Sequence, residues 1–128
     1  MSSSDGADFK TWFDAKYAET DGFTALILLI SMANNRVDML SCSYVHVIGS
    51  GTTWTDMKAM LDVSRRKWDA FAVFPEYPPG GGPLIDLVAK ARLQERIDDV
   101  TANRMVLNDA GLFDARGRSI RIDPLEIN

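Results

Sequence analysis

The stretch from Ser41 to Glu76 constrains the fold of this chain more than any other. An apolar run (44–48) is followed by a glycine turn (49–53), a helical pattern (54–67) and a second apolar run (70–74). Two short apolar runs that bracket a helix predict a βαβ unit, and such a unit requires parallel strands. We therefore expect an α/β (or α+β) domain whose three- to five-stranded mixed sheet is built around this unit.

The residues before this unit predict a helix and then a buried segment of ambiguous type. Four aromatic side chains recur at helical spacing near the N-terminus and are expected to pack on the core: Phe9, Trp12, Phe13 and Tyr17. Residues 23–33 are apolar throughout, so periodicity does not distinguish a helix from a strand there. The turn-forming pair Asn34-Asn35 favours a strand. In that case residues 25–33 pair antiparallel with residues 36–48.

A long helix is predicted after the connector of prolines and glycines. Pro83 suits the first helical position, and nothing interrupts the pattern before a glycine cap at Gly111. A helix over residues 83–110 would be about 42 Å long, whereas a domain of this size is about 36 Å across. The helix is therefore expected to break near residues 98–101 or to project from the body. The tail predicts a short edge strand over residues 118–122.

This long helix carries apolar side chains on two opposed faces. The first face holds Leu84, Leu87, Val88, Ala91, Ala102, Met105 and Val106. The second face holds Leu93, Ile97, Val100 and Leu107. One face can cover the sheet, whereas the other needs a second partner, either the N-terminal helix or another chain. The four residues of the second face are our candidate interface, and the expected partner is a second copy or another protein.

A candidate ligand site follows from the βαβ prediction. The glycine turn opens a helix, so its free N–H groups would form a concavity that attracts a small anionic ligand. In a parallel unit the loops after both strands emerge at one edge, where open α/β sheets bind ligands. The candidate ligand residues are Ser50, Gly51, Thr52, Thr53, Glu76, Tyr77, Gly80, Gly81 and Gly82. The turn matches neither a Walker loop nor a full dinucleotide fingerprint, so an ordinary strand-to-helix turn is the alternative.

Charge and composition disfavour several classes of function. The chain has 128 residues, a net charge of −4, one cysteine (Cys42) and one histidine (His46). The acidic balance disfavours nucleic acid as the main partner, because phosphate binding needs clustered Lys and Arg. One cysteine and one histidine permit no cysteine-rich zinc site, so no metal and no cofactor is expected. Positions 42 and 46 are separated by about 13 Å along a strand, which excludes a Cys–His dyad.

The N-terminal segment and the longest apolar run bear on the expected location of the protein in the cell. We expect a single domain over residues 1–128, with a frayed tail over residues 1–7. The N-terminus lacks the basic start and apolar core of a signal peptide, and residues 23–33 are too few to span a bilayer. A cytoplasmic protein without membrane contact is therefore expected.

Two functions remain open at this point. The leading one is a non-catalytic protein-interaction or regulatory domain, self-associating in one version through the helix over residues 83–110. It depends on the opposed apolar faces and on the lack of a catalytic constellation in the sequence. The alternative is a small-ligand or anion-binding protein, or an enzyme, with its site at the carboxyl ends of the parallel strands. An enzyme is the less favoured of the two.

Overall fold

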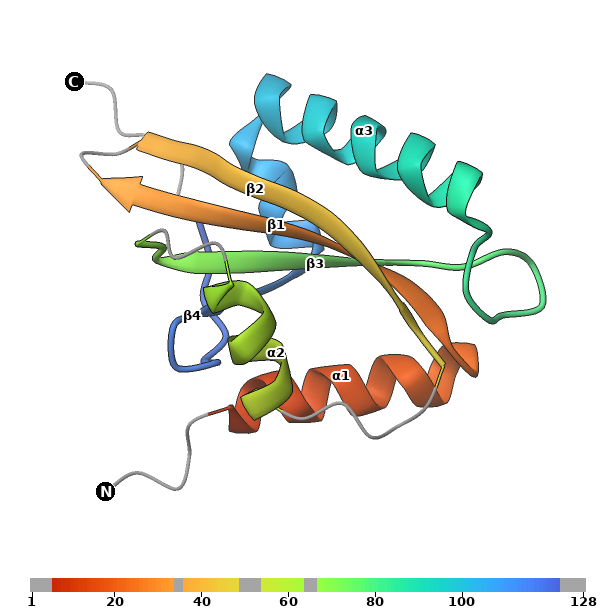
Figure 1. Ribbon diagram of the computed structural model, residues 1–128. Coiled ribbons are helices and arrows are strands. Elements are labelled where there is room, and N and C mark those ends of the chain that lie inside the picture. The colour runs from red at the N-terminus through yellow and green to blue at the C-terminus, as the bar shows by residue number, and fades with distance from the viewer. Residues whose placement is uncertain (1–5, 34–35, 49–53, 64–66, 123–128) are drawn as a thin grey trace.

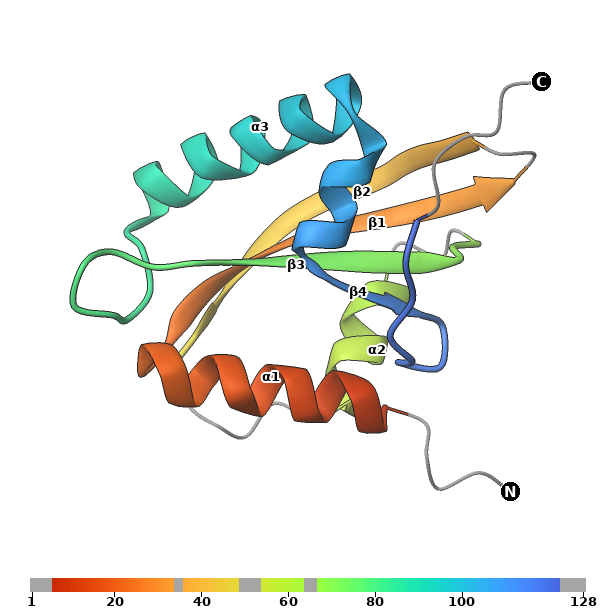
Figure 2. The same cartoon turned by 180° about the vertical axis from the view of Figure 1, so that it is seen from behind.

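The structure is a computed structural model that describes residues 6–33, 36–48, 54–63 and 67–122. In chain order its elements are α1 (Ala7–Thr20), β1 (Phe23–Ala33), β2 (Arg36–Val47), α2 (Trp54–Asp62), β3 (Ala70–Glu76), α3 (Asp86–Ala102), the 3-10 helix η1 (Arg104–Asp109) and β4 (Gly111–Asp114). The strands form one sheet, with α1 and α2 on one face and α3 and η1 on the other (Figures 1 and 2). The described chain is thus a three-layer α+β arrangement.

The sheet topology corrects the parallel βαβ prediction. The strand order is β2-β1-β3-β4, and each neighbouring pair is antiparallel. The strands on either side of α2, β2 and β3, do run in the same direction, because each is antiparallel to β1. However, β1 lies between them, so they share no hydrogen bonds. The mixed sheet around a parallel unit is therefore wrong, whereas the combination of helices with a sheet is confirmed.

The central place of β1 follows from its residues. Side chains alternate between the two faces of a strand, and in β1 both sets are apolar. Those facing α1 and α2 are Phe23, Ala25, Ile27 and Leu29. Those facing α3 are Leu26, Leu28 and Ile30. A strand buried on both faces lacks polar alternation, which is why periodicity left this segment ambiguous. The expected antiparallel hairpin with β2 is confirmed, and Asn34-Asn35 lies outside the described residues.

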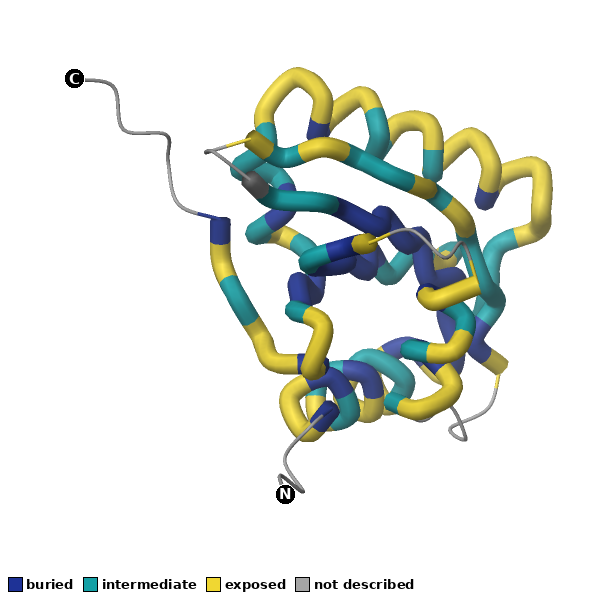
Figure 3. Tube along the Cα trace, turned by 60° about the vertical axis from the view of Figure 1, so that its left-hand side comes forward, coloured by how far each residue is buried: buried dark blue, intermediate teal, exposed yellow. Residues whose placement is uncertain are grey.

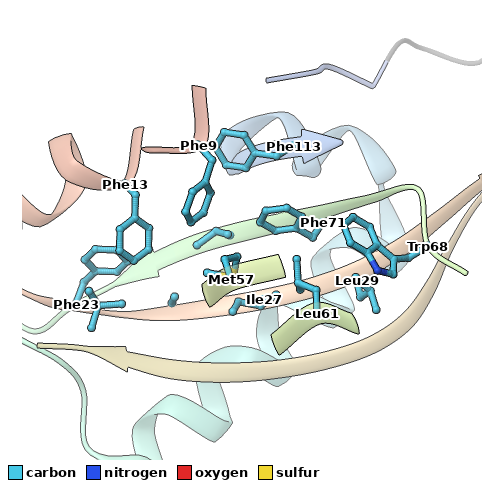
Figure 4. Packing of buried hydrophobic residues seen from close by; sticks show 13 residues of the cluster. Phe9, Phe13, Phe23, Ile27, Leu29, Met57, Leu61, Trp68, Phe71 and Phe113 are labelled. Atoms are coloured by element: carbon cyan, nitrogen blue, oxygen red, sulfur yellow. The ribbon is translucent and has the colours of Figure 1, made fainter. Parts of the chain in front are cut away.

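Aromatic rings from several elements fill the core between the sheet and α1 (Figure 4). The ring centroid of Phe9 in α1 lies 5.4 Å from that of Phe113 in β4 and 6.0 Å from that of Phe71 in β3. Phe13 lies 5.5 Å from Phe23 by the same measure. Such pairs contribute about 0.5–1.5 kcal/mol each beyond their buried area. The expected packing of the N-terminal aromatic side chains on the core is confirmed.

Helix α2 is shorter than the sequence suggested. It ends at Asp62, and its buried side chains are Met57 and Leu61. Trp68 is also buried, but it lies after the helix, and its Nε1 donates to Asp62 Oδ1 over 3.0 Å. Apolar side chains in this part of the chain therefore reach the core from the helix and from the segment that follows it.

The predicted helix over residues 83–110 is divided into two. α3 begins only at Asp86, because Ile85 is still extended (φ −76°, ψ 156°). It ends before Asn103, whose backbone is also extended (φ −155°) and whose side chain accepts the Met105 N–H at the start of η1. The chain thus breaks, as it must to stay within the domain, just after the expected position.

The tail also differs from the prediction. Gly111, expected as a helix cap, begins the strand β4. Of the expected strand over residues 118–122, Ser119 forms one antiparallel bridge with Phe113. Asp114 holds the intervening turn. Burial by itself raises the pKa of Asp114, but the N–H groups of Arg118 and Arg116 and the Arg118 guanidinium outweigh it and lower the pKa below its usual value.

Candidate functional site

Polar side chains form a row across one end of the sheet, on the face that α3 covers. Thr24 of β1 lies opposite His46 of β2 on one side and opposite Glu76 of β3 on the other. Directly opposed residues of antiparallel strands share a face. The row lies at the end of the sheet where β2 and β3 end and β1 begins. It therefore brings residues of three strands close to the segment that leads into α3.

Thr24 connects this row to the segment before α3. Its side chain is fully buried (0% exposed), and its Oγ1 accepts the Leu84 N–H over 2.8 Å. The same oxygen lies 2.9 Å from His46 Nδ1, and His46 Nε2 lies 2.7 Å from Asp86 Oδ1. When the Thr24 hydroxyl donates to Nδ1, the ring proton is on Nε2 and is donated to Asp86.

Asp86 is held as an anion at the start of α3. The hydrogen bond from His46 lowers the pKa of Asp86, and a side-chain hydrogen bond from Tyr44 acts in the same direction. The Tyr44 and His46 rings lie 5.5 Å apart between centroids. A carboxylate in the first turn also complements the positive end of the helix dipole. These contacts attach the first turn of α3 to β2.

This hydroxyl, imidazole and carboxylate are not placed for nucleophilic catalysis. A hydroxyl nucleophile must be accessible to its substrate. Here the Thr24 hydroxyl is buried, whereas the Asp86 side chain at the other end of the chain of hydrogen bonds is 72% exposed. The row therefore acts on the fold, by fixing the loop before α3 against the sheet.

Glu76, a candidate ligand residue, is paired inside the molecule. Its Oε2 accepts hydrogen bonds from Arg96 Nη2 over 2.6 Å and from Arg96 Nε over 3.1 Å. The guanidinium also lies 5.3 Å from the ring centroid of Phe74. The bond to Glu76 raises the pKa of Arg96, so the guanidinium stays charged. The pair fastens α3 to β3, and the Glu76 charge is already compensated.

The other candidate ligand residues divide into two groups. Ser50, Gly51, Thr52 and Thr53 lie outside the described residues. Tyr77, Gly80, Gly81 and Gly82 lie in the loop between β3 and α3, at the end of the sheet where β2 also ends. The Gly81 N–H donates to the Pro78 carbonyl, and the Gly82 N–H donates to the carbonyls of Thr20 and Gly22. The Gly82 N–H thus holds the loop against the end of α1 and the turn that follows it.

The candidate interface residues pack mainly inside the molecule. Val100 and Leu107 are buried, Leu93 packs against the same cluster beneath α3, and Ile97 is half-buried. Leu87, on the other face of the helix, is 77% exposed. The sequence did not say which face turns to the sheet; in the structure it is the face that holds our candidate interface residues. Little of these side chains is left for another chain.

The two edges of the sheet differ. The edge at β4 is covered by the segment that follows it, because the Asp114 N–H donates to the Arg118 carbonyl and the Ile120 N–H donates to the Leu112 carbonyl. At the opposite edge, β2 is the outermost strand, and no strand of the described ranges lies beyond it (Figure 1). Exposed and half-buried residues follow one another along this strand (Figure 3).

Hydrogen bonds elsewhere in the sheet show which β2 groups point outward. The Ile30 carbonyl accepts the Asp69 N–H, and the Met32 N–H donates to the Asp69 carboxylate. Even-numbered β1 residues therefore direct their backbone N–H and C=O groups towards β3. Backbone groups alternate sides along a strand, so odd-numbered β1 residues bond to β2. Their β2 partners are Ser41, Ser43, Val45 and Val47. The outward N–H and C=O groups are those of Cys42, Tyr44 and His46.

The position of Pro75 agrees with this alternation. Pro75 lies opposite Ala25, so its backbone nitrogen, which carries no hydrogen, faces the β4 side of β3. β4 does not extend as far as Pro75, because its first residue, Gly111, pairs with Val73. Proline is tolerated in a strand where no ladder bond is required.

We call the outer side of β2 over residues 41–47 the free edge. This run contains no Pro, Lys, Arg, Asp or Glu, the residues with which exposed edges are usually protected from pairing. It begins after a register shift that leaves Leu40 as an extra residue, and bulges of this kind end regular pairing. The charged residues of β2, Arg36 and Asp38, lie beyond that shift. No strand of the described chain pairs with the outward backbone groups of the free edge.

Two hollows are lined by described residues. The larger, of about 560 Å³, lies between α1 and the segment after β4 and includes Trp12 in its wall. Two of its polar side chains are engaged, since Asp8 accepts the Ser119 N–H and Asn108 makes two bonds to the Ile122 backbone. The smaller, of about 160 Å³, lies between α2 and β2, beside the free edge. It is lined by Ile27, Leu29, Ser41, Ser43, Met60, Leu61 and Val63.

Comparisons with protein-family models, with curated proteins and with solved structures found no match. Within the four described ranges, no three side chains of His, Cys, Asp or Glu gather as a metal site would require. No helix in the same ranges is long and apolar enough to cross a membrane.

Sequence reasoning missed the free edge and the role of His46. A signal for the edge was present, because residues 41–47 carry no formal charge and no proline next to a predicted hairpin. No local signal identified the Asp86 partner of His46, since the two residues are 40 positions apart.

Proposed function

We propose that this chain is a non-catalytic protein-interaction domain that binds its partner by strand addition at the free edge. The observation that supports the proposal is the set of outward backbone groups of Cys42, Tyr44 and His46, which the described chain leaves without a strand partner. In strand addition, main-chain hydrogen bonds supply affinity and the side chains on either face supply specificity. The proposal keeps the interaction function expected from the sequence and moves its main surface from α3 to β2.

The polar row supports this function by making the free edge rigid. His46 lies at the end of the free edge, and its ring is bonded to Thr24 in β1 and to Asp86 in α3. A strand held on one side by β1 and on one face by α3 loses little freedom when a partner strand adds to it. Preorganisation of this kind lowers the entropic cost of binding.

A peptide selection tests the proposal without a known partner. Random peptides displayed on phage are selected against the immobilised chain, and each selected peptide is then tested on two variants. Cys42→Pro removes an outward N–H, whereas Cys42→Ala removes the same thiol and keeps that N–H. We expect extended peptides that bind the wild type and Cys42→Ala equally and bind Cys42→Pro at least tenfold more weakly. Selected peptides that bind all three proteins alike would contradict the proposal.

A further inference from the structure

We infer that the strand that adds to the free edge is β2 of a second copy of this chain, antiparallel to the first about a twofold axis at Tyr44. The inference depends on the proposed function and names its partner. The regular part of β2 runs from residue 41 to residue 47, and Tyr44 is its midpoint. A twofold pairing that uses the whole run must therefore be centred on Tyr44.

The outward backbone groups fit this register. With the axis at Tyr44, the two Tyr44 residues lie opposite each other, and Cys42 of each copy lies opposite His46 of the other. All of these residues point their N–H and C=O groups to the free edge. Opposed residues of this type exchange two hydrogen bonds per pair, so three pairs give about six bonds between the copies.

Other registers are less favourable for physical reasons. If the axis lay between two residues, the pairing would shift by one residue. Outward groups would then lie opposite inward groups, so the ladder could not form. An axis at Ser43 or Cys42 keeps the alternation but brings the register shift at Leu40 into the pairing. Each of these registers shortens the regular ladder, because a bulge interrupts the regular pairing.

The small hollow beside α2 favours a second copy over an unrelated strand. Two of its walls are the small side chains of Ser41 and Ser43, and the others include Met60 and Leu61 from α2. In the Tyr44 register, Val45 of the second copy lies opposite Ser43 on this face. Val45 is only half-buried in one copy, so a branched apolar side chain meets a partly apolar hollow of about 160 Å³ at each end of the ladder. No Lys, Arg, Asp or Glu lies within the paired run, so like charges do not oppose the contact.

The dimensions of the contact indicate how strong it is. A run of seven strand residues is about 24 Å long, and a sheet with a helix layer on each face is about 30 Å thick. The contact therefore covers at most about 720 Å² on each copy, below the roughly 800 Å² per partner of a stable interface. We expect a reversible dimer that forms at tens of micromolar and dissociates on dilution.

Sedimentation velocity tests self-association with the wild-type chain and the matched pair of variants. The wild type and Cys42→Ala should shift from monomer to dimer between about 1 and 500 µM, and Cys42→Pro should remain a monomer over the same range. Circular dichroism confirms that each variant is folded. A wild-type monomer at 500 µM, or a dimer of folded Cys42→Pro, would overturn the inference.

A crosslinking experiment tests the register and does not depend on the proline variant. In the double variant Cys42→Ala/Tyr44→Cys, the two new thiols face each other at the axis, with Cα atoms about 5.5 Å apart, which a disulfide can bridge. In the wild type the two Cys42 residues are about 13 Å apart along the ladder, too far for a disulfide. Under mild oxidation we expect covalent dimers from the double variant only. Equal crosslinking of both proteins, or crosslinking of the wild type alone, would overturn the Tyr44 register.

These results separate the inference from the function on which it depends. If the chain stays a monomer and yet binds selected peptides in a manner sensitive to Cys42→Pro, the second copy is wrong and the interaction function stands. If peptides and a second copy both fail to bind at the free edge, the proposed function fails too.

Discussion

Replacement of Thr24 by valine should weaken the fold more than its small change in shape suggests. Valine has nearly the shape of threonine but no hydroxyl. The variant therefore leaves the Leu84 N–H without its acceptor and His46 Nδ1 without its partner, at a position that is 0% exposed. Thr24→Ser is the matched control, because it keeps the hydroxyl and removes one methyl group.

The magnitude follows from these contacts. A buried donor left unsatisfied costs about 1–3 kcal/mol. The His46 side chain is 28% exposed, so water replaces part of what it loses, and we assign most of the cost to the Leu84 N–H. The free energy of unfolding should therefore fall by about 2–3 kcal/mol in Thr24→Val. In Thr24→Ser it should fall by about 1 kcal/mol, the value of one buried methyl group.

Urea unfolding at pH 7, followed by tryptophan fluorescence, measures both changes. A chain of this length is expected to have an unfolding free energy of about 6–19 kcal/mol, so both variants should remain folded without urea. The comparison requires that the dependence on urea be the same for all three proteins. If Thr24→Val is no less stable than Thr24→Ser, the Thr24 hydroxyl does not hold the loop before α3, and the role given to the polar row is wrong.

Three further predictions concern the fold around the site. Gly117→Ala should lower the free energy of unfolding by about 3 kcal/mol, and Gly80→Ala by only about 1 kcal/mol. Both residues have positive φ, but only at Gly117 would a Cβ meet backbone, 2.7 Å away at the start of α1. Equal losses in thermal unfolding would contradict this. Leu107→Ala should cost about 2–4 kcal/mol and Leu87→Ala less than about 0.5 kcal/mol, since the first side chain is 0% and the second 77% exposed. The reverse order in urea titrations would show that Leu87 of α3, and not Leu107 of η1, packs on the sheet. Asp114→Asn should lower stability by about 1–2 kcal/mol near pH 7. The folded-state pKa of Asp114 lies below its usual value of 3.8, so its contribution is present above that pH and is lost as the pH falls through the folded-state pKa; a stability difference from the wild type that stays constant down to pH 2 would count against this role.

Local patterns in the sequence were sufficient for some of the elements and for the packing of the N-terminal helix on the core. The spacing of Phe9 and Phe13 predicted an N-terminal helix packed on the core, because helical periodicity depends only on nearby residues. The same holds for the strand character of residues 70–74 and for the hairpin that pairs β1 with β2. In each case the decisive contacts involve neighbours in the chain or a clear apolar face.

The arrangement of the strands could not be predicted from those patterns. Two apolar runs joined by a helix favour a parallel pair, and nothing between residues 44 and 74 argues against one. The structure places β1 between them because residues 23–30 are apolar on both faces and are fully covered only in the centre of the sheet. The sequence did contain this clue, since a strand at an edge would not be apolar throughout.

The polar contacts of the candidate site were beyond sequence reasoning for a different reason. Glu76 is paired with Arg96 and His46 with Asp86, at separations of 20 and 40 residues. No periodicity links positions so far apart. The same limit applies to the helix faces, because two opposed apolar stripes do not reveal which one turns inward until the sheet beneath them is known.

Residue-resolved amide exchange of β2, measured by NMR at about 1 µM and again at several hundred micromolar, tests the free edge most directly. In dilute solution we predict slow exchange at the inward N–H groups of Ser43 and Val45 and fast exchange at the outward N–H groups of Cys42, Tyr44 and His46, with the outward groups becoming slow at high concentration. Slow exchange of the outward groups already in dilute solution, or no alternation along residues 41–47, would contradict the account.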